Sequence, residues 1–370
     1  MTGNIQRIAI STGGGDAPGL NAVIRAVVLA AEQRGWECFG IREGFNGILL
    51  PERYPADGIF RIHAEQVRDI GHLGGTILGT TNHGNPLKFA TTMPDGSIQE
   101  VDRTSEIHAA LKQMQIDALV CIGGDGTLTI AHALHQQGLR VVGVPKTIDN
   151  DLDKTFTTFG FDTAVAFATE CVDRLHSTAA SHQRIMVVEV MGRYAGWIAL
   201  HAGIASNAHA ILIPEIAYDI DKLAAHLAAR DRAGHHYSIV IAAEGAVSVQ
   251  GQQEVQETAS AGYVERLGGI GEKIARELEQ KTGKEARAVV LGHLLRGGSP
   301  TAFDRISALR FGAAAVRALD EGHSGIMVAL AFPNVNYVAL EDVAGRMKGV
   351  PLDGDTLQTA RDLDICLGDK

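Results

Sequence analysis

The segment PKTIDND (145–151) holds three side chains that chemistry on a phosphate group would need. Lys146 is followed by Asp149 and Asp151, and all three come directly after the apolar run RVVGV (140–144). One carboxylate could accept the proton of an attacking hydroxyl and the other could organise Mg²⁺ or water, while the lysine neutralises charge on the transferred group. Such a triplet also occurs in solvated acidic turns, but its place after an apolar strand favours the catalytic interpretation.

A second loop, GGDGT (123–127), follows the apolar run DALVCI (117–122) and precedes a helical pattern. Backbone amides of such a loop can hold phosphates while Asp125 holds a metal ion, directly or through water. The aspartate could instead only begin the helix or close a turn. The glycines on both sides of it favour a site for a magnesium–nucleotide complex.

A third loop, GGGDAPGLN (13–21), follows RIAIS (7–11) and also precedes a helical pattern. Glycines allow the backbone to approach a phosphate, and a helix N-terminus offers free N–H groups. The loop is neither a Walker A motif, since no GK[ST] follows, nor a dinucleotide GxGxxG, since Asp16 and Pro18 break that spacing. An ordinary strand-to-helix turn remains the alternative.

The fourth group is cationic and consists of Arg184, MGR (191–193), Arg287 and HLLRGG (293–298). These arginines stand beside apolar strands, where a buried guanidinium without an anion would be costly. A sugar phosphate is a natural counter-ion, and salt bridges between strands or subunits are the alternative.

Short β-branched runs alternate with longer helical patterns, which predicts an α/β fold with doubly wound parallel sheets. In such sheets ligands bind beyond the carboxyl ends of the strands, where the loops described above lie. The clearest helix is expected at 263–282, with Leu267, Ile270, Ile274 and Leu278 on one face. The expected strands are 7–11, 117–122, 140–144, 184–190, 210–214, 237–244, 286–292 and 325–331. The other expected helices are 18–34, 104–115, 127–137, 160–179, 193–206, 219–233 and 304–321.

Composition excludes several classes of protein. The chain has 370 residues, 45% of them hydrophobic and 21% charged, which excludes collagen, coiled coils and disorder and predicts two or three domains. A net charge of −10, without a basic block, argues against nucleic acid or an anionic membrane as the main partner. The four cysteines are widely spaced, and no signal peptide or membrane span is found, so we expect reduced thiols and a cytoplasmic location.

Together these motifs resemble the 6-phosphofructokinase family, in the family's order and from residue 8 to about 310. The segments that carry the resemblance are GGGDAPGLNAVIRA, GGTILGTTN, IGGDGT, PKTIDNDL, QRIMVVEVMGRYAGWIAL, the ILIPE and IAAEG strands, and ARAVVLGHLLRGGSPTAFDR. The resemblance implies two doubly wound parallel-sheet domains with the active site in the cleft between them. The larger, donor-binding domain would hold 1–159 plus about 294–340, and the smaller, sugar-phosphate domain 160–293 plus about 341–370.

The resemblance also implies roles for individual residues in transferring a phosphoryl group from Mg–ATP to the 1-hydroxyl of fructose 6-phosphate. Asp149 would be the general base and Asp125 would hold Mg²⁺. The implied catalytic residues are Asp149, Asp151, Lys146 and Arg193, and the implied donor-binding residues are Gly14, Gly15, Gly124, Asp125, Gly126 and Thr127. The implied sugar-phosphate residues are Thr147, Ile148, Asp149, Met191, Gly192, Arg193, Glu244, His293 and Arg296, with Arg184 and Arg287 reaching into a neighbouring subunit's site. That last feature implies a homodimer or homotetramer.

Two positions bear on the phosphoryl donor. Pyrophosphate-using members typically carry Asp after GGD and Lys before TIDND, and ATP-using bacterial members carry Gly at both; this chain combines Gly126 with Lys146. We expect ATP, because a glycine at 126 leaves room for the α-phosphate and adenosine. Asn82 stands where ATP-using members have an arginine that bridges the phosphates, and we hypothesise that Lys146 takes over that role.

Other readings remain open. A pyrophosphate-dependent, reversible phosphofructokinase would keep the sugar chemistry. A non-catalytic sugar-phosphate sensor is a different class, and the presence of both Asp125 and Asp149 argues against it. A dehydrogenase is disfavoured because the chain lacks GxGxxG with an acidic residue about 20 positions later. Lipid and NAD kinases share a GGDGT-type loop, but PKTIDND and HLLRGGSP favour the sugar kinase.

Overall fold

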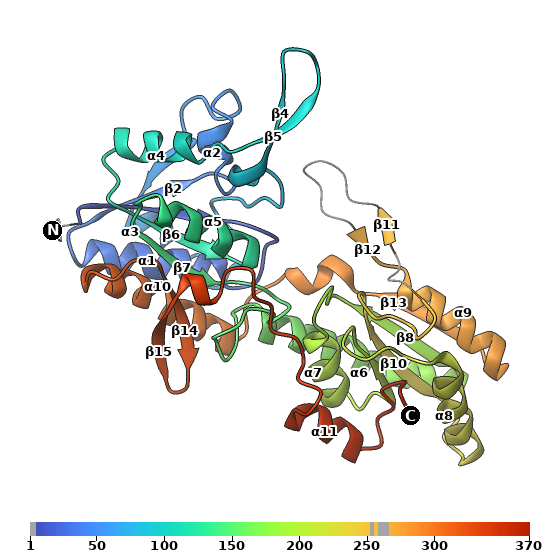
Figure 1. Ribbon diagram of the computed structural model, residues 1–370. Helices are drawn as coiled ribbons and strands as arrows, with labels where there is room; N and C mark the ends of the chain where they lie inside the picture. Colours follow the sequence, from blue (N-terminus) through green and yellow to red (C-terminus); the bar gives the residue numbers. More distant parts are fainter. Residues whose placement is uncertain (1–4, 252–254, 258–265) are drawn as a thin grey trace.

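A computed structural model describes residues 5–251, 255–257 and 266–370 of the chain. It confirms the predicted α/β class, with a seven-stranded and a four-stranded sheet in two lobes (Figure 1). The large sheet, ordered β15-β14-β7-β6-β1-β2-β3, contains β1 (Arg7–Thr12), β2 (Glu37–Ile41), β3 (Ile59–Ile62), β6 (Ala118–Gly123), β7 (Val141–Pro145), β14 (Ile326–Ala331) and β15 (Asn334–Ala339). The small sheet, ordered β13-β8-β10-β9, contains β8 (Ile185–Val190), β9 (Ala210–Leu212), β10 (Ser238–Ala243) and β13 (Ala286–Val290). Two antiparallel pairs are separate: β4 (Phe89–Thr92) with β5 (Ile98–Val101), and β11 (Val255–Glu257) with β12 (Arg266–Leu267).

Helices cover both faces of each sheet. The α-helices are α1 (Leu20–Glu32), α2 (Asn46–Leu49), α3 (Ala64–Val67), α4 (Thr104–Gln113), α5 (Asp125–Gln136), α6 (Phe161–His182), α7 (Trp197–Ala205), α8 (Ile220–Arg232), α9 (Ile270–Thr282), α10 (Ala302–Asp320) and α11 (Asp355–Asp362). The short 3₁₀ helices are η1 (Pro86–Lys88), η2 (Gly292–Arg296) and η3 (Leu340–Asp342).

Successive side chains of the central strands enter different cores, as the pleat of a strand requires. Ile8 and Ile10 pack with α1 and α10, whereas Ala9 between them packs with α4 and α5. The strands of the small sheet do the same between α6 and α7 on one face and α8 and α9 on the other. Because both faces are covered, the central strands are apolar nearly throughout, which is the signal seen in the sequence. The ribbon shows α1 beside α10 on one side of the large sheet and α4 on the other (Figure 1).

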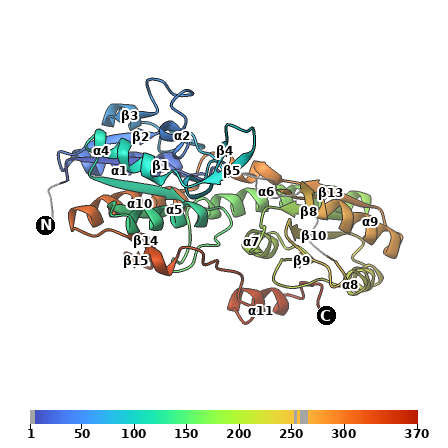
Figure 2. The same cartoon turned by 45° about the horizontal axis from the view of Figure 1, so that its top comes forward.

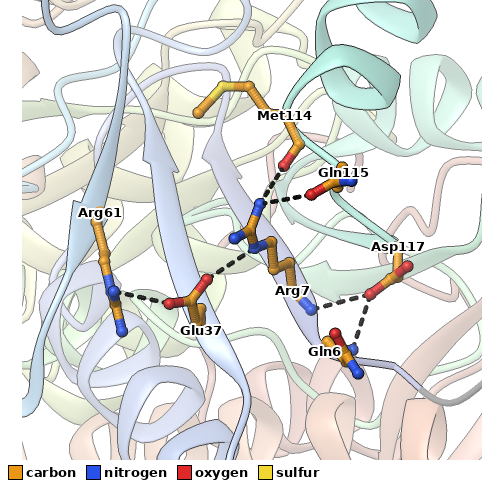
Figure 3. A network of polar contacts seen from close by, with 7 residues as sticks. All are labelled: Gln6, Arg7, Glu37, Arg61, Met114, Gln115 and Asp117. Atoms are coloured by element: carbon orange, nitrogen blue, oxygen red, sulfur yellow. Dashed lines mark hydrogen bonds and ion pairs between the residues drawn. The ribbon is translucent and has the colours of Figure 1, made fainter.

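The sheets are parallel in the middle, but the large sheet has antiparallel edges. β1, β6 and β7 run parallel, while β3 pairs antiparallel with β2 and β15 pairs antiparallel with β14. Parallel strands end at the same edge, so the loops after β1, β6 and β7 meet there. The opposite edge carries a separate polar network, in which Arg7 bonds Glu37 and the main-chain N–H groups of Gln6 and Arg7 donate to Asp117 (Figure 3).

The chain passes between the lobes more than once. It enters the small lobe before α6 and returns through η2 and α10, which packs against α1. After β15 the C-terminal segment crosses again, and α11 packs against α7 (Figures 1 and 2). Cys366 then pairs with Ala210 at the edge strand β9.

Each predicted strand is present, but the helix expected at 263–282 begins later, at Ile270. Gly268 and Gly269 adopt φ values of 145° and 87°, which ends the helical path, and Leu267 lies in β12. Residues 263–265 of that prediction lie outside the described part of the chain. The sequence patterns missed β2, β3, β15, the β4–β5 hairpin and α11. Among the described residues, every helix is too short or too polar to cross a membrane.

Candidate functional site

A pocket of about 150 Å³ opens where β1, β6 and β7 end, and three of the predicted loops meet in it. It is lined by Gly14, Gly15, Gly124, Asp125, Gly126, Thr127, Lys146, Thr147 and Arg296. The loop 13–21 supplies two glycines, GGDGT supplies the N-terminal end of α5, and PKTIDND supplies the lysine. Arg296 arrives from η2, which follows β13 of the other sheet.

Close packing or backbone conformation requires glycine at several positions in and beside the pocket. A Cβ on Gly123 would lie 2.3 Å from Oγ1 of Thr127, and a Cβ on Gly15 would lie 2.6 Å from Nη1 of Arg296. Gly14 has a φ of 78°, which side chains other than glycine rarely adopt. Since α5 begins at Asp125, its first backbone N–H groups have no partner within the helix and are available to an anion.

Lys146 links the PKTIDND loop to the glycine-rich loop 13–21. Its Nζ donates to the carbonyl oxygen of Gly15, and the residue is only 3% exposed. Burial, followed by repulsion from Arg296, lowers the pKa of Lys146 to about 7. A bound anion would oppose both effects and hold the amine in its charged form.

The two aspartates of PKTIDND, Asp149 and Asp151, are half-buried next to this lysine. Oδ1 of Asp149 is inaccessible to solvent and has no hydrogen-bond partner, while its main-chain N–H donates to Oγ1 of Thr147 at 3.1 Å. Burial, followed by repulsion from Asp151, raises the pKa of Asp149 above its ordinary value of 3.8. Burial likewise raises the pKa of Asp151, against the opposing effects of Thr147 and Lys146. A carboxyl with a raised pKa and an unpaired oxygen is suited to take a proton from a hydroxyl.

The small sheet brings further charges toward Asp149. Arg193 and Glu244 follow the carboxyl ends of β8 and β10, and both interact electrostatically with Asp149. Burial raises the pKa of Glu244, and the charge of Arg193 opposes that shift. Met191 and Ile148 are buried in the same core. The predicted sugar-phosphate residues after β8 and β10 therefore lie close to the loop 146–160 between β7 and α6, called the catalytic loop below because it carries the predicted base Asp149.

Two predicted residues lie away from this pocket within this chain. Arg184 precedes β8 and Arg287 is at the start of β13, at the end of the small sheet opposite Arg193. Both pair with Glu285, at 3.0 and 2.5 Å. His293 is exposed on η2. The role of the two arginines in a neighbouring subunit stays a prediction.

Asp125 is the residue predicted to hold a metal ion. No group of three or more histidine, cysteine, aspartate or glutamate side chains in the described ranges is arranged to bind a metal by itself. Asp125 and Asp151 are nevertheless close enough for the charge of the first to raise the pKa of the second. Mg²⁺ is typically held by one or two carboxylates together with substrate phosphates, so this donor set fits it.

The sequence analysis gave the C-terminal segment beyond about 330 no role in the site. The main-chain N–H of Gly345 donates to Oδ1 of Asp125 at 2.7 Å. No local pattern could have revealed a contact made by a backbone amide 220 residues further along the chain.

A larger pocket, of about 220 Å³, lies at the amino ends of β8 and β10, away from the phosphate loops. Its polar lining consists of Asp231, Lys284, Arg232, Ser238 and Thr282. Asp231 is already paired with Lys284 and His236. The larger pocket is therefore not the candidate active site, because it lacks the unpaired carboxylate and the glycine-rich loops.

Comparisons with known proteins agree with this geometry. The family model described as phosphofructokinase matches residues 7–319. An ATP-dependent 6-phosphofructokinase from Chloroflexus aurantiacus is 48% identical over 370 residues, covering 100% of both chains. A pyrophosphate–fructose 6-phosphate 1-phosphotransferase from Amycolatopsis mediterranei is 46% identical and covers 94% of this chain and 97% of that protein. The solved phosphofructokinase of Pichia pastoris in the T-state has a TM-score of 0.77 and 30% identity, and the match covers 98% of this chain and 37% of that longer one.

Proposed function

We propose, because the chain belongs to the phosphofructokinase family, that it transfers the γ-phosphoryl group of ATP to the 1-hydroxyl of fructose 6-phosphate. The products are fructose 1,6-bisphosphate and ADP. One observation carries the proposal: Asp149, with its unpaired inaccessible oxygen, stands beside the glycine-lined pocket that holds Lys146 and Asp125.

In this proposal the pocket binds the phosphates of the donor. Backbone amides of Gly15 and of the first turn of α5 hold phosphate oxygens, with Gly14 facing them, and Asp125 with the support of Asp151 would hold Mg²⁺. The bound ion would neutralise charge on the donor phosphates. Thr80 and Thr81 fix the loop 13–21, since Oγ1 of Thr80 donates to the carbonyl of Gly14 and the N–H of Gly14 donates to the carbonyl of Thr81.

Asp149 acts as the general base. It takes the proton of the sugar 1-hydroxyl as that oxygen forms a bond to the γ-phosphorus, and the bond from the γ-phosphorus to the bridging oxygen breaks to release ADP. Lys146 and Arg193 stabilise the negative charge of the transferred group. The raised pKa of Asp149 supports this role, because a more basic carboxylate accepts a proton more readily.

The environment of residue 126 supports ATP over pyrophosphate as the donor. A Cβ on Gly126 would meet no heavy atom within 4 Å, so the glycine borders open space. An aspartate there would crowd and repel an α-phosphate. Asn82 is exposed in the loop beside Thr81, and the nearby buried cation is Lys146. This arrangement supports the hypothesis that Lys146 replaces the missing arginine.

Three further parts of the proposal concern the whole molecule. The donor domain comprises 1–159 with about 294–340, and the sugar-phosphate domain comprises the rest. The chain forms a homodimer or homotetramer in which Arg184 and Arg287 complete a neighbour's site; both are partly exposed at the amino end of the small sheet. The four cysteines are free thiols, which supports a cytoplasmic location.

The test is an assay of purified protein with fructose 6-phosphate and Mg²⁺, supplied with either ATP or pyrophosphate, in which the bisphosphate is measured. We expect turnover with ATP. Turnover with pyrophosphate alone would replace the proposal by the reversible enzyme. Asp149→Asn should lose about 10²–10⁴-fold in kcat and still bind fructose 6-phosphate, as a general base requires. Sugar binding without turnover in the wild type would indicate a sensor.

A further inference from the structure

The C-terminal segment at 340–350 contacts both acidic motifs of the site. Its first residues form η3 beside the large sheet, and Gly345 then bonds Asp125. Met347 pairs with Leu152 in an isolated antiparallel bridge, which places residue 348 against the catalytic loop. Two residues later the N–H of Val350 donates to Glu215 at 2.7 Å, on the small-sheet side.

Lys348 makes most of these contacts with the catalytic loop. Its main-chain N–H donates to the carbonyl of Asp151 at 2.8 Å. Its Nζ donates to Oδ1 of Asn150 at 3.1 Å and to the carbonyls of Thr155 and Phe156 at 3.0 and 3.2 Å. An ammonium group has three N–H donors, so all of them are used on one loop.

The same lysine is anchored from the small lobe. Its carbonyl accepts a hydrogen bond of 2.9 Å from Nε1 of Trp197, the first residue of α7. Its Nζ lies 5.7 Å from the centre of the Trp197 ring, within range of a cation–π interaction. Lys348 therefore links the catalytic loop to helix α7 of the small lobe.

Asn150 is the point at which this anchor acts on the aspartates. It lies between Asp149 and Asp151 and has a φ of 51°, in the left-handed region. Its Oδ1 also accepts from the N–H of Thr158 at 3.3 Å. Because Asn150 lies between the two aspartates, a change in its backbone dihedral angles would redirect the carboxylates of Asp149 and Asp151.

We infer that Lys348 is a positioning residue: through Asn150 and the carbonyl of Asp151, it holds the 149–151 turn so that Asp149 faces the sugar hydroxyl. This inference rests on the proposed function, because it specifies what holds the base of that reaction in place. It assigns to the C-terminal segment a part in catalysis that the motifs themselves do not show.

The experiment compares Lys348→Met, which keeps the aliphatic stem and removes the donors, with Lys348→Arg and with Lys222→Met. Lys222 is the matched control, since its Nζ also donates to a carbonyl of the C-terminal segment, that of Asp369, at 2.8 Å. We expect Lys348→Met to lower kcat by about 10²-fold, the effect of a misplacement of roughly 1 Å, with KM for each substrate within threefold. Lys348→Arg should recover at least a tenth of the wild-type kcat, and Lys222→Met should match the wild type.

A second measurement does not depend on turnover. Amide hydrogen exchange of the peptide 147–158 should become faster in Lys348→Met and remain unchanged in Lys222→Met. Asn150→Gly, which accepts the left-handed backbone and removes the Oδ1 acceptor, should reproduce the loss of kcat. The double variant should lose less kcat than the product of the two single losses, because both single variants remove the hydrogen bond between Lys348 and Asn150. If Lys348→Met does not fold, the inference is tested by the kcat of Asn150→Gly and by the amide hydrogen exchange of peptide 147–158 in that variant.

The inference is overturned if folded Lys348→Met keeps kcat within threefold of wild type, or if Lys222→Met loses as much. It is also overturned if the effects of Lys348→Met and Asn150→Gly multiply, or if exchange at 147–158 is unchanged. A wild-type protein that fails to phosphorylate fructose 6-phosphate with ATP would instead refute the proposed function. The exchange measurement would still show whether Lys348 holds the loop.

Discussion

The main-chain N–H of Gly345 donates to Oδ1 of Asp125, so the C-terminal segment contacts the carboxylate that begins α5. The bond orients this carboxylate and leaves its other oxygen, Oδ2, for a further ligand. An amide at the same position could accept the Gly345 N–H equally well, but it would carry no charge for a cation. This difference separates the structural role of Asp125 from its proposed role in holding Mg²⁺.

Asp125→Asn should therefore fold like the wild type and lose activity. We expect kcat to fall by about 10²–10³-fold, because a charge that supports the transferred phosphates is lost. The Mg²⁺ concentration needed for half-maximal rate should rise. A magnesium titration of the rate, with thermal unfolding as the control for folding, checks this. Unchanged magnesium dependence would remove Asp125 from the metal site.

Lys146→Met should lower kcat by about 10²–10³-fold, since a cation next to the transferred group is replaced by an apolar chain of similar length. Lys154→Met is the matched control, because Lys154 is exposed and its nearest ionic partner, at 3.5 Å, is Asp153. Steady-state rates with ATP measure the effect. If Lys146→Met remains within a few-fold of the wild type, Lys146 does not replace the arginine missing at Asn82.

The pH dependence of the reaction should report Asp149. A general base works when it is deprotonated, so kcat/KM for fructose 6-phosphate should rise with pH through the raised pKa of this carboxyl, well above 3.8. Repulsion from Asp151 is the second cause of that shift. Asp151→Asn removes this charge, so its rising limb should move to lower pH, although the maximum rate also falls. A limb that stays in place or moves to higher pH would contradict this account.

Residue 126 should control the choice of donor. Gly126→Ala adds a Cβ that meets no heavy atom within 4 Å, so KM for ATP should change by less than about threefold. Gly126→Asp adds a carboxylate that repels the α-phosphate and should raise KM for ATP by at least about tenfold, the equivalent of roughly 1.4 kcal/mol. The alanine variant is the control for backbone effects. Equal KM values for ATP in both variants would show that residue 126 does not lie next to the bound α-phosphate.

Much of the fold could be predicted because its signals are local. Apolar runs such as 117–122 and 184–190 read as buried parallel strands, and the structure confirms them as β6 and β8. The start of α9 was predicted too early, because the apolar spacing continues through Leu267 although Gly268 and Gly269 turn the backbone away. The edge strands β3 and β15 could not be predicted, because their side chains are only partly buried and lack the continuous apolar pattern.

The sequence by itself determined which loops carry the chemistry, because glycines, aspartates and a lysine at strand ends are local features with local physical causes. It also determined the α/β class, since the alternation of apolar runs follows from burial on two faces. Only the tertiary structure decided that the Nζ of Lys146 reaches Gly15 and that Arg184 and Arg287 lie at the far end of the small sheet. It alone brought Gly345 and Lys348 onto the two acidic motifs, because contacts between residues 220 and 198 positions apart depend on how both sheets pack.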